Sequence, residues 1–268
     1  MSAQHDARWF AGGTIFVLCA VVLGASIGPA GPDWWRVPGE LINRLPLIEF
    51  NTGVSDAEWA IVWKIRMPRV VLGGLVGGML SLAGATYQGV FRNPLVDPYL
   101  LGAAAGAGLG ATVALTIGRG ATADWPIDPV PTVAFVFAVA TVMVTYAVGA
   151  AFNGSRSGVT LVLAGVAVVS FTSAIQTFIL QRNVEAIREV FRWILGSLSL
   201  ASWADVRLVV PYVAVSTVVL LFHRRHLDAF RVGDDEAATL GVSVARTRLI
   251  IVVAATLGTA AVVSVSGL

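Results

Sequence analysis

Basic side chains gather where a long apolar stretch begins, at Lys64, Arg66 and Arg69, with Pro68 between the two arginines. Fixed positive charges in this position can anchor a helix at a membrane surface or pair with carboxylates of another protein. An exposed ion pair contributes only ~0–1 kcal/mol, but it sets the orientation and the rate of an encounter. Arg66 and Arg69 are therefore a candidate docking site, and interfacial anchoring is the alternative.

A second polar cluster, residues 227–242, contains three consecutive acidic residues directly after a glycine. Acidic side chains are favoured in the first turn of a helix, and glycine often ends one, so the pattern predicts a short helix with a small apolar face. A short rigid helix between two apolar segments can transmit movement, whereas an ordinary loop is the alternative. The residues that carry this prediction are Gly233, Asp234, Glu236, Ala237, Leu240 and Gly241.

Side chains for catalysis or metal binding are scarce in this sequence. No phosphate-binding loop of the form G-x-x-x-x-G-K-S/T occurs, so the chain is not expected to hydrolyse ATP itself. The sequence also shows no nucleophile with a neighbouring base that would indicate a catalytic pocket. His223 and His226 are one helical turn apart, but among arginines they fit a solvated basic face better than a metal site. We expect no enzymatic activity, no resident cofactor and no metal.

Composition places the chain in a membrane. Of its 268 residues, 56% are hydrophobic and only 13% are charged, whereas a soluble domain carries about 25% charged residues. Uncharged runs recur that approach the roughly 20 residues needed to cross a hydrocarbon core. The runs are continuous rather than alternating, which favours helices over a barrel. The net charge of +2, without a basic block that contains aromatic residues, gives no reason to expect nucleic acid as a partner.

We expect residues 1–268 to form one all-α transmembrane domain, a polytopic bundle with about seven spans. Pro68 suits the opening of the second span, and the break at 92–94 ends it because the residue before proline avoids the α region. Short helices are expected at 39–45, at the membrane interface, and at 193–198. The expected spans are residues 9–28, 68–89, 98–117, 132–152, 160–180, 205–222 and 249–268.

Glycines recur at a spacing of four in the second and third expected spans. This spacing aligns missing side chains on one face of a helix and lets backbones approach closely in lipid. We therefore expect both helices to pack tightly inside a bundle. The glycines concerned are Gly73 and Gly77, Gly74 and Gly78, and then Gly102, Gly106 and Gly110.

No expected span carries a charged residue in its middle. Proton-driven transporters usually need ionisable groups inside the membrane, so the pattern argues against a secondary transporter and suits a wide pore for a bulky substrate. The arginine-rich stretch 223–248 favours the cytoplasmic side of the membrane. That orientation places the N-terminus in the cytoplasm as well.

The string RMPR…LAGATYQGVFRNPLVDPYLLGAAAGAG, residues 66–108, resembles the membrane permease subunits of bacterial ABC importers for iron chelates, haem and vitamin B12, the FecCD/BtuC-like permeases. In that family an L-R-x-P-R opening, a G-x-x-x-Q turn and an R-N-P-L-A-x-P-x-x-L-G string recur in this order. Several matches in a row make the resemblance specific. It covers about residues 61–268.

The resemblance implies roles for the polar clusters. The two arginines of the L-R-x-P-R string, here Arg66 and Arg69, dock an extracytoplasmic binding protein in that family. Residues 227–242 resemble the G-x-x-x-A-x-x-L-G coupling helix, which seats in a groove of the ATPase subunit. One further turn resembles the region that closes the pore on the cytoplasmic side, although the family's turn is richer in hydroxyl groups. The residues of this candidate gate are Ser157, Gly158 and Thr160.

The resemblance also implies a complex in the bacterial inner membrane. Its parts would be a second copy of this chain around a central pore, two copies of a separate ATPase that binds ATP, a binding protein and a metal-chelate substrate. A ferric siderophore is the first expectation for the substrate, and haem or cobalamin is the other. The family has ten helices, so the chain is expected to lack a C-terminal part. The alternatives are a truncated membrane fragment without transport activity and a secondary transporter.

Overall fold

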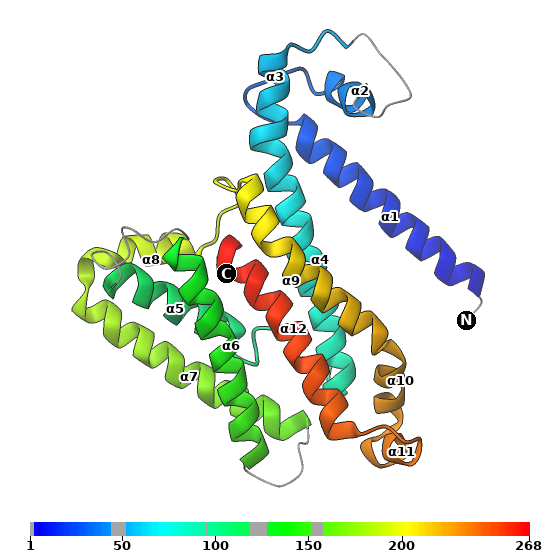
Figure 1. Cartoon of the computed structure of the whole chain (residues 1–268), viewed down its shortest axis with the longest axis vertical. Coiled ribbons are helices and arrows are strands. Elements are labelled where there is room, and N and C mark those ends of the chain that lie inside the picture. Colours follow the sequence, from blue (N-terminus) through cyan, green and yellow to red (C-terminus); the bar gives the residue numbers. More distant parts are fainter. Residues whose placement is uncertain (1–2, 44–51, 95, 118–127, 152–157) are drawn as a thin grey trace. The chain divides into compact units, whose positions relative to one another are not determined.

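The structure is a computed structural model, and it describes residues 3–43, 52–94, 96–117, 128–151 and 158–268. Over these residues it contains helices and turns and no strand, as the sequence predicts (Figure 1). The chain divides into two compact units, each described by itself below. Unit 1 is Met1–Gly74 with Leu198–Val206, and unit 2 is Leu75–Ser197 with Arg207–Leu268.

Six helical stretches in the described part of the chain are long and apolar enough to cross a membrane. The third expected span is instead a shorter apolar helix, α5 (Ala103–Ile117), of 15 residues. At 1.5 Å per residue this helix is ~22 Å long, less than the ~30 Å of a hydrocarbon core. Turns occupy residues 99–102, and Gly102 there has a φ of +97°, so the helix begins later than predicted. The six stretches are Arg8–Ser26, Asp56–Phe91, Pro129–Ala151, Val159–Arg182, Trp203–Phe222 and Val244–Ser266.

Unit 1 contains α1 (Ala3–Ser26), α2 (Arg36–Asn43) and α3 (Asp56–Ile61), which continues through the π-helical turn η1 (Val62–Arg66) into α4 (Met67–Phe91), of which unit 1 holds the residues up to Gly74. Ala25, Val37 and Val62 form its small buried core. A helix lies close to the expected 39–45, as α2 from 36 to 43, while residues 44 and 45 are outside the described residues. The helix that contains the second expected span begins at 56, so Pro68 lies inside this helix rather than at its start.

Pro68 is accommodated inside this continuous helix because the turn before it is wider than an α-turn. The N–H of Met67 donates to the carbonyl of Val62, five residues back. Continuing this pattern would require an N–H at residue 68 for the carbonyl of Trp63, and proline has none. The indole N–H of Trp203 donates to that carbonyl at 2.8 Å instead, and the two rings lie 5.0 Å apart.

Unit 2 is built on α5, α6 (Pro129–Ala151) and α7 (Gly158–Arg182), which pack on one another. The predicted close approach of the α5 glycines is present: a Cβ atom on Gly106 would lie 2.5 Å from the carbonyl oxygen of Phe137 in α6. In α4 the prediction holds at Gly73, where a Cβ atom would lie 3.2 Å from Leu198 Cδ1, but not at the other three glycines. A Cβ atom on Gly74, Gly77 or Gly78 would have no described atom within 4 Å.

The rest of unit 2 follows α7 in the order η2 (Val184–Ala186), α8 (Ile187–Ile194), the later part of α9 (Trp203–Phe222), α10 (Arg224–Val232), α11 (Asp234–Thr239) and α12 (Val244–Ser266). The short helix expected at 193–198 lies instead at 187–194. Gly196, with a φ of +68°, lies in the turn that follows α8. The new position gives α8 one buried residue, Val190, and an exposed Phe191.

Candidate coupling and docking sites

The short helix predicted within residues 227–242 is present as α11, and its C-terminal end is closed by main-chain hydrogen bonds. Val242 N–H donates to the carbonyl of Ala237 at 3.1 Å, and Gly241 N–H donates to that of Ala238 at 3.0 Å. Gly241 has a φ of +82°, the left-handed conformation that glycine adopts readily. This is the Schellman arrangement, which satisfies carbonyls at the end of a helix. It gives α11 a defined length and exit direction.

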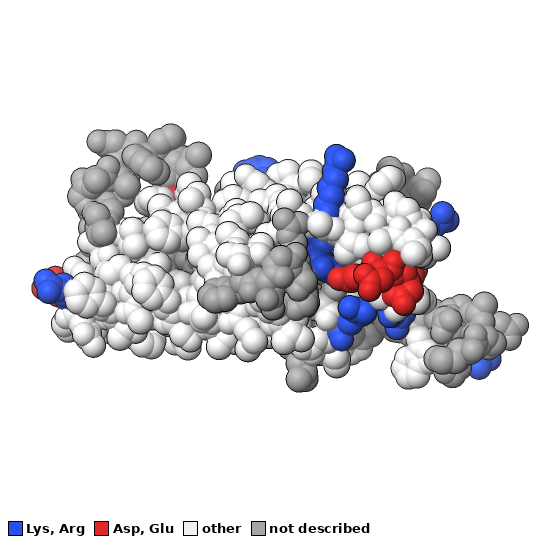
Figure 2. Space-filling view, turned by 90° about the horizontal axis from the view of Figure 1, so that it is seen from below, with Lys and Arg blue, Asp and Glu red and all other residues white. Residues whose placement is uncertain are grey.

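The side chains of α11 do not form the single apolar face that the sequence suggested. Ala237 is fully buried, whereas Leu240 is 70% exposed. The reason is that Leu240 lies in the turn that follows α11, not in the helix, and its side chain points away from the side of α11 that is buried. The exposed surface of the segment therefore combines Leu240 with the acidic first turn. Figure 2, seen from below Figure 1, shows a group of acidic side chains on this face with basic side chains close beside it.

A buried arginine of α12 fixes the start of α11. Arg248 is only 3% exposed, and its Nη2 donates to Oδ1 and Oδ2 of Asp234 at 2.8 and 2.9 Å. Its guanidinium carbon lies 5.5 Å from the centre of the fully buried Phe230 ring of α10. A buried guanidinium requires an opposite charge and hydrogen-bond acceptors, and Asp234 supplies both. Arg248 thus connects α10, α11 and α12.

Sequence reasoning did not select Arg248 or Phe230 as site residues. Arg248 was one of several arginines used for orientation, and the pairing spans 14 residues across a glycine and a turn. The available signal was its position directly before the last apolar run, where a buried charge needs a partner. The helix α10 was not predicted, because its composition is polar and arginine-rich without an apolar run.

The C-terminal end of α4 contributes a second arginine. Arg92 ends the helix in the left-handed conformation, with a φ of +50°, and Asn93 N–H donates to the carbonyl of Gln88 at 3.3 Å. The predicted break after Phe91 is therefore confirmed. Arg92 Nη2 lies 3.8 Å from Asp234 Oδ1, in a pair that is about half exposed on the arginine side.

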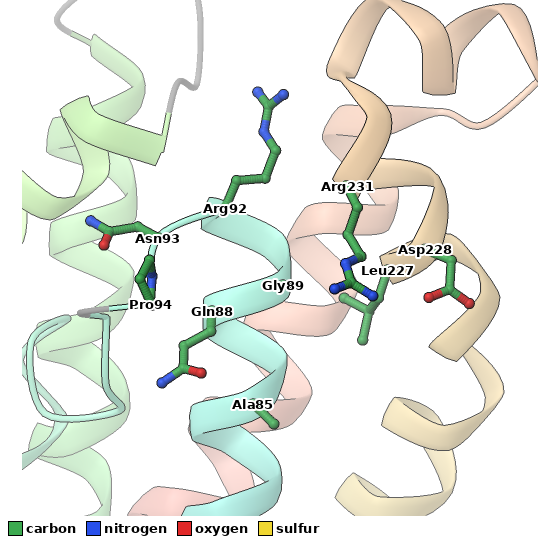
Figure 3. Close-up of a pocket in the computed structure, with 9 residues that line it drawn as sticks. All are labelled: Ala85, Gln88, Gly89, Arg92, Asn93, Pro94, Leu227, Asp228 and Arg231. Carbon is green, nitrogen blue, oxygen red and sulfur yellow. The ribbon is translucent and has the colours of Figure 1, made fainter. Parts of the chain in front are cut away.

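A pocket of about 490 Å³ lies between the end of α4 and α10. Figure 3 shows Gln88, Arg92 and Asn93 on the α4 side and Leu227 and Arg231 on the α10 side. A Cβ atom on Gly89 would lie at the ordinary contact distance of 3.7 Å from Leu227 Cδ2, so the approach of the two helices does not require glycine here. The lining of the pocket combines charged, amide and apolar side chains.

The two predicted docking arginines occupy different environments. Arg66 is 6% exposed, and its guanidinium donates to the carbonyls of Ala25 at 3.1 Å and Ser26 at 2.6 Å, and also to that of Ala30. These carbonyls belong to the end of α1 and the turn after it, where a positive charge is favoured. Arg66 is therefore not a free docking charge, because its donors are used within the chain.

Arg69 is half-buried and Lys64 is exposed, so these two charges remain available for the docking prediction. Of the candidate gate residues, Ser157 lies outside the described residues. Gly158 begins α7, and Thr160 lies half-buried in its first turn. Over the described residues, no group of three or more His, Cys, Asp or Glu side chains could hold a metal ion.

The geometry above agrees with a comparison against known families, in which residues 15–268 match the FecCD transport family. The chain belongs to this family. The cobalamin import system permease protein BtuC of Halobacterium salinarum is 37% identical over 215 residues, which cover 80% of this chain and 57% of that protein. The hemin transport system permease protein HmuU of Yersinia pestis is 33% identical over 228 residues, which cover 80% of this chain and 65% of that protein.

An uncharacterized ABC transporter permease protein of Bacillus subtilis, YvrB, is 37% identical over 262 residues, or 95% of this chain and 72% of that protein. The chain thus spans between 57% and 72% of the length of these three FecCD relatives. A solved "metal-chelate type ABC transporter" in an inward-facing conformation has a TM-score of 0.79 at 21% identity, and the match covers 98% of this chain and 77% of that one. This last likeness concerns the fold.

Proposed function

We propose that the chain is the permease subunit of a binding-protein-dependent ABC importer for a metal chelate. The observation that carries the proposal is α11, a short capped helix that Asp234 and the buried Arg248 hold in place, with Leu240 70% exposed. A helix of this kind gives a separate ATPase subunit a rigid part to grip. The membership of the FecCD family supports the same assignment.

In this proposal ATP is bound and hydrolysed on the ATPase, and α11 receives the resulting movement. The exposed Leu240 would fill an apolar part of the ATPase groove, while the exposed acids Asp235 and Glu236 would face its polar rim. Site residues for coupling are Gly233, Asp234, Glu236, Ala237, Leu240 and Gly241. The arginine-rich stretch 223–248, which contains α11, then lies in the cytoplasm. The same orientation places the N-terminus of this inner-membrane protein in the cytoplasm.

The pore would form between two copies of the chain. On one face of α7 the side chains of Ser170, Ser173 and Thr177 are exposed within this chain. Hydroxyl groups are less suited to face lipid than to line a water-filled path. The hydroxyl groups of Ser170 and Thr177 also donate to carbonyls of their own helix. A second copy would enclose this face. Gly158 and Thr160 of the candidate gate would then lie at its cytoplasmic end, and Ser157 is proposed for the gate from the sequence alone.

The opposite side of the membrane would receive a binding protein. Lys64 and Arg69 supply the positive charges that would pair with carboxylates of that protein, while Arg66 holds the local structure. The substrate is proposed as a ferric siderophore first, with haem or cobalamin next. Relatives named for cobalamin, hemin and iron chelatin transport support this class.

The proposal is tested by uptake in a strain that lacks this gene, with labelled ferric siderophore, haem and cobalamin offered in turn. Loss of one uptake activity, restored by the gene, is expected. Leu240→Asp should fail to restore uptake and to co-purify with the ATPase, while Ala238→Ser, at a neighbouring exposed position, should restore both. If Leu240→Asp supports full uptake, or if no uptake depends on the gene, the proposed function is wrong.

A further inference from the structure

Helix α12 is the most buried of the six candidate spans. Of its span 67% is buried inside the described chain, against 11–33% for the others. With 23 residues it is ~35 Å long. In Figure 1, α11 lies at one end of α12 and the end of the chain at the other. Each end contacts a different short element of unit 2, so the helix connects two places that are otherwise far apart.

At the inner end the contact is the ion pair of Arg248 with Asp234. The arginine side chain is 4% exposed and the carboxylate side chain 34%. Removal of one partner would leave a buried charge without its counter-ion, which is strongly unfavourable. Arg248 is the fifth residue of α12, so a displacement of α11 acts directly on the first turns of this helix.

At the outer end the contact is between main chains. Ser197 N–H donates to the carbonyl of Ser266 at 3.0 Å. Gly196 and Gly267 face each other with φ values of +68° and +83°, and a Cβ atom on Gly267 would lie 2.5 Å from Gly196 Cα. No flexible side chain separates the end of α12 from the turn that follows α8.

Between these ends α12 is continuous and closely packed. It contains no proline, and a Cβ atom on its one glycine, Gly258, would lie 2.5 Å from Met79 Sδ of α4. Thr256 shares a hydrogen bond of 2.9 Å with the buried hydroxyl of Tyr87. A helix without a kink site in such packing moves as one body.

We propose that Arg248 and Gly267 are positioning residues that make α12 couple α11 to the turn at residues 193–197 on the opposite side of the membrane. The coupling is a property of this chain; only its use, to carry the ATPase signal to the outer mouth of the pore, rests on the proposed function. Because the two contacts act in series through one helix, loss of either one should interrupt the coupling to the same extent.

The first experiment uses the permease chain alone in lipid nanodiscs and follows amide hydrogen exchange by mass spectrometry. Arg248→Gln should speed exchange at least 5-fold at Ser197, whose N–H bonds to the far end of α12, and Gly267→Ala should do the same at Val242, next to the near end; allosteric couplings of 1–3 kcal/mol correspond to about 5–150-fold. Arg246→Gln, on the exposed face of the same helix, and Ser266→Ala, which keeps the main-chain contact, are the matched controls.

The double variant Arg248→Gln with Gly267→Ala distinguishes a series connection from two local defects. If the two contacts act in series, exchange at Ser197 and at Val242 in the double variant should be no faster than in the faster of the two single variants. Independent local effects would instead add. Unchanged exchange at the far end in either single variant would overturn the proposal, and so would additive effects. A general loss of folding is recognised separately, because it would also speed exchange in α5 and α6.

The second experiment adds the ATPase and the binding protein. The ratio of the binding-protein-stimulated to the basal ATPase rate should fall at least 5-fold in Gly267→Ala and stay unchanged in Ser266→Ala. A normal ratio in Gly267→Ala would refute the proposed use of the coupling. If the unmodified chain recruits no ATPase while the exchange result holds, the coupling stands and the proposed function is the part that fails.

Discussion

Gly106 of α5 lies directly against the main-chain carbonyl of Phe137 in α6, where a Cβ atom would come within 2.5 Å of the oxygen. Neither backbone can yield without displacing its helix, so Gly106→Ala should destabilise the chain by about 1–3 kcal/mol. Gly77→Ala is the matched control, because no described atom lies within 4 Å of its Cβ position. Thermal unfolding in detergent measures both, and equal midpoints would contradict the close α5–α6 contact.

Arg66 should be needed for the structure of unit 1. Arg66→Ala leaves the carbonyls of Ala25 and Ser26 without these donors in a buried place, at a cost of about 1–3 kcal/mol. The expected result is a lower unfolding midpoint and faster proteolysis of the segment after α1. Lys64→Ala, on an exposed neighbour, should leave both unchanged. If Arg66→Ala is as stable as the parent chain, the guanidinium does not hold the end of α1.

Docking of the proposed binding protein should depend on Lys64 and Arg69. Charge reversal of both, to glutamate, should weaken binding up to ~10-fold at low salt, since exposed pairs contribute ~0–1 kcal/mol each and reversal adds repulsion. The affinity of the parent chain should also fall as salt rises, and that of the variant should fall less. Surface plasmon resonance on nanodiscs gives both quantities. Affinity and salt dependence equal to those of the parent would rule out this site.

At Arg92, replacing the side chain by that of glycine should stabilise the fold. A non-glycine residue in the left-handed region costs ~1–2 kcal/mol, whereas its half-exposed pair with Asp234 contributes ~0–1 kcal/mol. Arg92→Gly should therefore raise the free energy of unfolding by about 1 kcal/mol, while Arg92→Ala keeps the strained backbone and should lower it slightly. Denaturant unfolding compares the two variants. If glycine is no better than alanine, the end of α4 is not strained.

The number and approximate position of the apolar helices could be predicted from the sequence, because length and composition decide which segments can cross a membrane. The short helix α11 could also be predicted, since Gly233, the acids after it and Gly241 are local signals. The continuity of the helix through Pro68 could not, because the hydrogen bond to the Trp63 carbonyl comes from Trp203, 140 residues away. A local pattern does not contain that donor.

The same limit applies to the candidate sites. Arg66 looks like a free surface charge in the sequence, and only the end of α1, about 40 residues earlier, shows where its donors go. Arg248 became a site residue for a similar reason, through Asp234 and Phe230. The residues of α11, which were predicted from local signals, lie in the helix expected. The roles of Arg66 and Arg248 depend on long-range contacts and differ from those predicted.

The π-helical turn Val62–Arg66 also fixes the angular phase of the helix that follows it. The bond from Met67 N–H to the Val62 carbonyl closes a turn with one residue more than an α-turn, so this turn winds the helix less per residue than an α-helix does. Successive residues of an α-helix are rotated by about 100°, so converting this turn to α-helix without removing a residue would rotate the residues after it by up to about that angle relative to α3. The Arg66 guanidinium would then point away from the carbonyls at the end of α1, and the carbonyl of Trp63 would accept from Met67 N–H instead of the Trp203 indole. Such a change would leave the chain helical and yet remove both contacts.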